Sequence, residues 1–172
     1  SLAHAGNSYG GAYFGTYSGT GEQGNFACFV GNDGWGAFIS YANNGGGGSY
    51  KEGFTVNSSG TFNFSLPSGT QVAGTISGST VTGTFFGWQG TGTFNGTLRP
   101  ASGAQQASVG YYTGTAKNNG GTAVGNLRLI LAADGSFRGT EVDLPDTGDV
   151  DDGFLGTINS QNQFSLTSAT GT

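Results

Sequence analysis

Short segments in which an apolar residue alternates with Gly, Ser or Thr follow one another along the whole chain. This period of two predicts strands with one apolar and one polar face, and the turn clusters between them predict hairpins. Asn32-Asp33-Gly34, for example, separates two such segments, and Asp-Gly is typical of tight hairpin turns. No segment shows the apolar period of an amphipathic helix. The pattern therefore predicts an all-β, antiparallel meander, folded as an up-and-down barrel or a sandwich.

Eight strands are predicted in the first half of the chain, and the pattern then starts again. Tyr112-Thr113-Gly114-Thr115 repeats Tyr13-Phe14-Gly15-Thr16, and residues 126–135 repeat residues 25–34, with Phe137 answering Phe38 after a two-residue gap. Residues 157–164 then repeat residues 55–62. The offset drifts only between about 99 and 102 residues, which indicates a duplication. The predicted strands of the first copy are 12–17, 26–30, 35–41, 53–56, 61–66, 72–76, 80–86 and 91–98.

The duplication divides the chain into a first β unit (12–99), a joint (100–107) and a second unit (108–172), preceded by an N-terminal segment (1–11). The second unit has about five strands, because nothing in it corresponds to residues 72–98. Five antiparallel strands leave two open edges, and open edges recruit other strands. The second unit extends the sheet of the first, or the repeat is cut short at this point, or another copy of the chain supplies the missing strands. In the last case residues 1–11 are a candidate donor strand.

The apolar faces of the first unit supply enough large side chains to fill a small barrel or a thin sandwich. Cys28, the single cysteine, lies in the apolar run 26–30 and is expected to be buried as a small hydrophobe. The predicted core is Phe26, Val30, Phe38, Phe54, Val56, Phe62, Phe64, Val72, Ile76, Val81, Phe85, Phe94 and Leu98.

The Gly-x-Phe-x-Gly and Gly-Thr-aromatic units recur through most of the chain. In this layout the chain resembles the Gly-rich tandem β-meander and barrel repeats of bacterial secreted and surface proteins. The resemblance implies an all-β repeat architecture, and it assigns a role to no individual residue.

The amino-acid composition excludes some classes of function and favours others. Only 9% of the residues are charged and the net charge is −5, so the cation density needed to bind nucleic acid is missing. No apolar run is long enough for a transmembrane helix. Low charge and a richness in Gly, Thr, Ser and Asn suit a secreted or cell-surface protein. We therefore expect an extracellular structural protein, a subunit of a filament or adhesive assembly joined by pairing of strands between copies.

The residues that could carry chemistry are few. His4 is the single histidine, so a zinc site or a nucleophilic triad lacks its parts, and we expect no enzyme activity. Acidic residues gather between 141 and 152, where alternating carboxylates next to Gly153 could bind Ca²⁺. A solvated acidic loop is the simpler interpretation, and no other cofactor is expected. The candidate calcium ligands are Asp146, Asp149, Asp151 and Asp152.

A non-catalytic carbohydrate-binding module is the alternative function. Its candidate ligand-binding residues are four rings near predicted turns, since exposed aromatic rings on a β surface stack on sugars; in the competing interpretation the same rings pack barrel ends or subunit contacts. They are Trp35, Tyr41, Tyr50 and Trp88. Three acceptor sequences for N-glycosylation begin at Asn57, Asn63 and Asn95.

Overall fold

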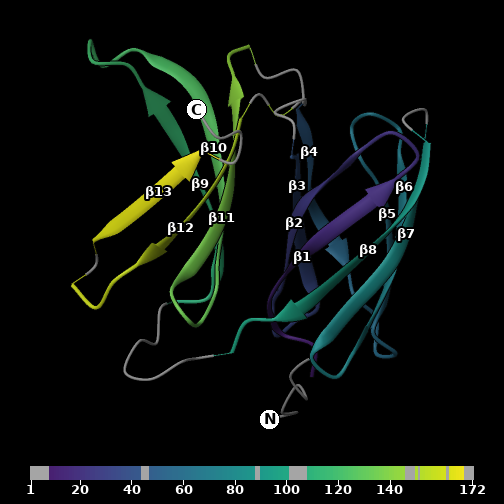
Figure 1. Ribbon diagram of the computed structural model, residues 1–172. Coiled ribbons are helices and arrows are strands. Elements are labelled where there is room, and N and C mark those ends of the chain that lie inside the picture. The colour runs from purple at the N-terminus through teal and green to yellow at the C-terminus, as the bar shows by residue number, and fades with distance from the viewer. Residues whose placement is uncertain are drawn as a thin grey trace.

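A computed structural model describes residues 8–43, 47–87, 90–100, 108–145, 150, 152–161 and 163–168. Within these residues the chain forms two antiparallel sheets and no helix, which confirms the predicted all-β class (Figure 1). The strands of the first sheet are β1 (Gly11–Gly19), β2 (Gln23–Val30), β3 (Trp35–Ala42), β4 (Gly48–Thr55), β5 (Thr61–Ser65), β6 (Gln71–Ser77), β7 (Thr80–Gly87) and β8 (Gly90–Leu98). Those of the second are β9 (Gly110–Lys117), β10 (Ala123–Leu131), β11 (Ser136–Asp143), β12 (Asp152–Ile158) and β13 (Phe164–Ser168).

The first sheet curls into a near-barrel. Its strand order is β4-β3-β2-β1-β8-β7-β6-β5, so β1 pairs with both β2 and β8, and only the seam between β4 and β5 has no ladder. The chain crosses this seam in one turn, in which the Asn57 N–H donates to the Thr61 carbonyl (3.0 Å) and the Gly60 N–H donates to the Asn57 carbonyl (2.9 Å). All eight predicted strands are therefore present, and of the two predicted architectures the first unit adopts the barrel.

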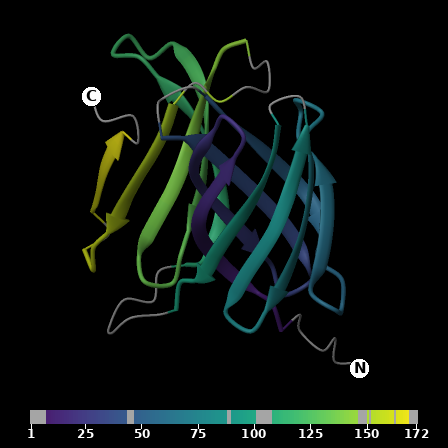
Figure 2. The same cartoon turned by 45° about the vertical axis from the view of Figure 1, so that its right-hand side comes forward.

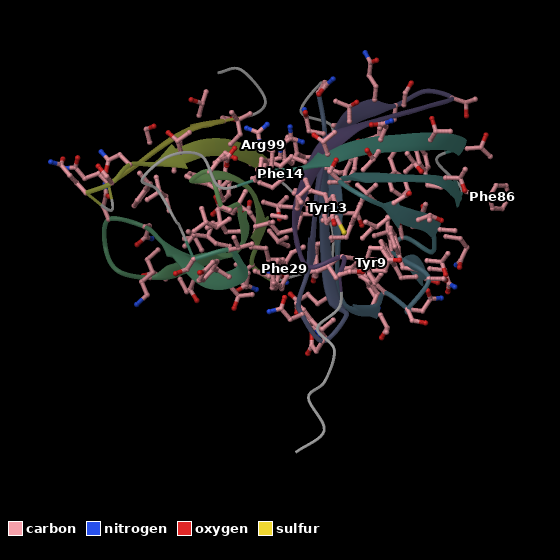
Figure 3. All side chains as sticks on the ribbon, turned by 90° about the horizontal axis from the view of Figure 1, so that it is seen from below. Tyr9, Tyr13, Phe14, Phe29, Phe86 and Arg99 are labelled. Atoms are coloured by element: carbon pink, nitrogen blue, oxygen red, sulfur yellow. The ribbon has the colours of Figure 1, made fainter. Side chains whose placement is uncertain are left out.

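The lumen of the near-barrel holds the main apolar core. Eleven of the predicted core residues are buried there, and Phe85 and Leu98 pack against them with partial exposure. Cys28 is fully buried, as expected. Tyr13 joins this core as well, and its hydroxyl donates to the carbonyl of Tyr9 (3.0 Å), which closes one end of the lumen (Figure 3).

The second sheet repeats the pairing of the first unit. Arg128 pairs with Thr113 as Ala27 pairs with Phe14, and the Asp134-Gly135 turn has the hydrogen bonds of the Asp33-Gly34 turn. The two turns have equal length, so the predicted two-residue gap is wrong: in the ladders Phe137 occupies the place of Gly36 rather than that of Phe38. The residue opposite this position also differs between the units. Phe54 lies opposite Gly36 in the first unit, and Gly156 lies opposite Phe137 in the second. Each pair thus keeps one ring lying over one glycine.

The second sheet does not extend the first, so that expectation is wrong. It packs face to face on the outer wall of the barrel, over β1, β2 and β3 (Figure 2). A second apolar cluster fills the contact, with Phe14 and Phe29 directed toward the second sheet while Phe86 points to the opposite side (Figure 3). The buried members of this cluster are Ala12, Phe14, Ala27, Ile39, Ile130 and Ala132.

Candidate functional site

The second sheet leaves open the face that its counterpart in the first unit encloses. Tyr13, Phe62 and Phe64 point into the lumen of the barrel and are buried. Their counterparts in the repeat are Tyr112, Phe164 and Leu166, with exposed fractions of 42, 67 and 55%. Exposed apolar surface of this kind marks an interaction site. The face is apolar in the pattern of a barrel interior, but within the described residues no strand covers it.

Both edge strands of this sheet also lack a partner within the described residues. In the first unit β1 pairs with β8 and β5 with β6, whereas their counterparts β9 and β13 each pair on one side only. Proteins commonly block such edges with lysine or proline. β13 carries neither, and β9 carries only Lys117 at its end. Within the part of the chain that the structure describes, both edges of this sheet are therefore open.

A pair of equivalent glycines shows how the edges of the two units differ. A Cβ added at Gly15 of β1 would lie 2.0 Å from the Asn95 carbonyl oxygen and 2.5 Å from the Cα of Gly96, because β8 runs against it. At the equivalent Gly114 of β9, the same Cβ would meet nothing within 4 Å. The repeat thus contains a glycine suited to close backbone approach at a place where no described backbone approaches.

Polar side chains hold the second sheet on the barrel. The Arg138 guanidinium, largely buried and with its pKa lowered by that burial, donates through Nη1 to the carbonyls of Gly15 (2.6 Å) and Phe26 (2.7 Å). Glu52 accepts from Arg128 Nε (3.3 Å) and from the Tyr111 hydroxyl (2.5 Å), and burial, followed by this bond to Glu52, raises the pKa of Tyr111. The position of the open sheet relative to the barrel is therefore fixed by charge-assisted hydrogen bonds.

The sugar-binding candidates do not form one exposed platform. Tyr41 is only 1% exposed, because its ring packs against Gly153 of the second sheet, so its assignment to a ligand surface is wrong. The guanidinium of Arg128 lies 3.5 Å from the centre of the Tyr50 ring and covers it. Trp35 is 38% exposed and packs beside Tyr111, with ring centres 5.9 Å apart. Trp88 lies outside the described residues.

Three of the four candidate calcium ligands, Asp146, Asp149 and Asp151, lie outside the described residues. The fourth, Asp152, begins β12 and accepts a hydrogen bond from the Ser168 hydroxyl (3.2 Å). No group of three metal-ligating side chains occurs in the part of the chain that the structure describes.

The three candidate glycosylation sites lie on the surface of the barrel. Asn57 is in the β4–β5 turn, where its side-chain oxygen accepts from the N–H groups of Ser59 and Thr61 (3.0 Å each). Asn63 and Asn95 lie on β5 and β8 with exposed side chains.

The candidate donor segment 1–11 is described only from residue 8 onward. Tyr9 packs against the barrel core and Gly11 begins β1, so the end of this segment belongs to its own barrel. Residues 1–7 lie outside the described residues.

Within the described residues no helix could cross a membrane. No family model, curated protein or solved structure matches this chain.

Proposed function

We propose that the protein is a structural subunit of an extracellular or cell-surface assembly, in which strands of another copy pair with the open edges of the second sheet. The observation that carries the proposal is the contrast between Gly15, where an added Cβ would overlap β8, and Gly114, where the same Cβ would meet nothing within 4 Å. A strand added to β9 in the register of β8 would occupy that place and cover Tyr112. Main-chain hydrogen bonds would then supply affinity, as in other cases of strand addition.

The apolar face supports the same proposal from independent side chains. Phe164 and Leu166 lie on β13, at the opposite edge from Tyr112, so exposed apolar side chains lie at both open edges of this face. Strands that complete the ladder would bury these side chains at the same time. The alternative, a carbohydrate-binding module, has less support, since Tyr41 is buried and Tyr50 is covered.

The proposal is tested by giving the second unit its own missing strands. A copy of residues 72–98 is fused after Thr172, and a fusion of the same residues in scrambled order is the matched control. Mass in solution by light scattering and negative-stain electron microscopy compare the two with the wild type.

The wild type and the scrambled fusion are expected to assemble, and the chain with the intact copy is expected to be monomeric. A wild-type protein that stays monomeric up to about 100 µM would overturn the proposal, because its dissociation constant would then be larger than that of ordinary specific association. So would a fusion with intact strands that assembles as the wild type does.

A further inference from the structure

The near-barrel is not completely filled. A cavity of about 320 Å³ lies at the end of the lumen where the β1–β2, β3–β4 and β5–β6 connections meet. It borders the seam between β4 and β5, with Ser49 on one side and Leu66 on the other. This volume is at the lower end of the range of small-molecule sites.

Aromatic rings line the apolar part of the cavity, and two of them pack directly against glycines in its wall. Phe38, Phe85 and Phe94 line it. A Cβ at Gly92 would lie 2.3 Å from the Phe85 ring, and one at Gly83 would lie 2.2 Å from the Phe94 ring. These rings therefore lie directly on the backbone of β7 and β8 and leave the lumen open.

The polar part of the lining carries a single sign of charge. Ser40, Ser49, Ser68 and Thr70 contribute hydroxyl groups to it. Glu22 is the only charged side chain among the described residues that line the cavity, and its Oε1 accepts the hydroxyl of Tyr17 (2.7 Å). No described lysine, arginine or histidine lies in the lining, so nothing there would neutralise an anionic ligand.

We infer that this cavity binds a small apolar molecule with one cationic amine, its hydrocarbon body against Phe38, Phe85 and Phe94 and its ammonium group at the Glu22 carboxylate. An ammonium group donates charge-assisted hydrogen bonds to a carboxylate, whereas a carboxylate ligand would face Glu22 with like charge. The site belongs to the first unit and is independent of the assembly of the second. It is expected in monomer and polymer alike.

The test uses N-phenyl-1-naphthylamine, an uncharged fluorescent molecule, as the reporter of cavity occupancy at pH 7. 4-Phenylbutylamine, which is cationic at this pH, and 4-phenylbutyrate, which is anionic and of similar length, compete with it. The expected result is saturable binding of one reporter per chain, with the amine displacing it at about tenfold lower concentration than the acid.

Two variants locate the binding. Ser40→Phe places a ring in the cavity and is expected to weaken reporter binding about tenfold or more, while Ser77→Phe places the same ring on the exposed face of β6 and leaves binding unchanged. Glu22→Gln keeps an acceptor for Tyr17 and is expected to abolish the preference for the amine. Melting temperatures of all variants show that the barrel is folded. Absence of saturable binding, equal binding to a folded Ser40→Phe protein, or an amine preference that survives Glu22→Gln would overturn the inference.

Discussion

Alanine substitutions at the equivalent glycines Gly15 and Gly114 test the stability of the barrel and the assembly of the second unit separately. At Gly15 the new Cβ would lie 2.0 Å from a backbone oxygen of β8, far inside normal contact. Because both atoms belong to a paired ladder, the overlap can be relieved only by moving the two strands apart. Overpacking costs about 1–3 kcal/mol, and this contact belongs at the upper end. At about 2–4 °C per kcal/mol for a chain of this size, Gly15→Ala is expected to lower the melting temperature by about 6–12 °C.

Gly114→Ala is the matched variant. It is expected to leave the stability of the monomer unchanged and to prevent assembly. The added methyl group meets nothing within 4 Å, so the free energy of unfolding of the monomer changes by about 0.5 kcal/mol or less. In an assembly, however, a strand that joined β9 in the register of β8 would meet this methyl group with the overlap seen at Gly15. Assembly is therefore expected to be lost while the monomer is fully stable.

Circular dichroism melts of dilute protein measure the first effect, and light scattering with electron microscopy measures the second. A Gly114→Ala protein that assembles like the wild type would refute a strand added beside β9. A Gly15→Ala protein with an unchanged melting temperature would refute the close approach of β8 on which the comparison depends.

Three further outcomes are expected. Phe164→Ser should leave the melting temperature of the monomer unchanged, because the ring is 67% exposed, and should weaken assembly in sedimentation assays; equal assembly would show that the open face is not used. Arg138→Gln should lower the free energy of unfolding by about 2–4 kcal/mol in denaturant titrations, since two buried charge-assisted hydrogen bonds are lost. Arg99→Gln, which breaks an exposed ion pair with Asp134, is the control and should cost less than about 1 kcal/mol. Burial raises the pKa of the Cys28 thiol to about 12, above its value in the unfolded chain, so its contribution to stability is complete below about pH 9 and is lost as the pH rises toward 12. Melts between these pH values should show a smaller decline for Cys28→Ala than for the wild type.

The strands and the duplication could be predicted because turn chemistry and the period of two are local. In β5, β6 and β8 exposed residues alternate with buried or half-buried ones, as the neighbours of Phe62 and Phe64 do, and these strands lie where the pattern predicts them. The turn at Asp134-Gly135 was likewise evident from its similarity to Asp33-Gly34. The predicted gap after it is wrong, because Phe137 resembles Phe38 in residue type but occupies the place of Gly36 in the ladder.

The packing of the second sheet on the barrel could be predicted only from a sequence pattern that is less evident than the alternation of apolar and polar residues. Residues 26–30 and 37–42 are nearly continuous apolar runs, which indicate strands buried on both faces. β2 and β3 are such strands, because one face lines the lumen and the other meets the second sheet. The prediction that Tyr41 lies on a ligand surface is wrong for the same reason, because β3 is buried on both faces. The alternation predicts no role for Arg128 or Arg138, although each occupies the same strand face as Ile130, which is buried between the sheets.

The same contrast between the two units supports the proposal that the open face of the second sheet takes part in assembly. The first unit uses both faces of β1 to β3, one for its lumen and one for the second sheet. The second unit uses one face for that contact, yet its other face still carries Tyr112, Phe164 and Leu166 in the register of a lumen. Exposed apolar side chains at these positions would favour non-specific association unless a defined partner covered them. A partner that adds strands satisfies the edges and the face together, whereas a partner that contacted the face alone would leave the backbone groups of β9 and β13 unpaired.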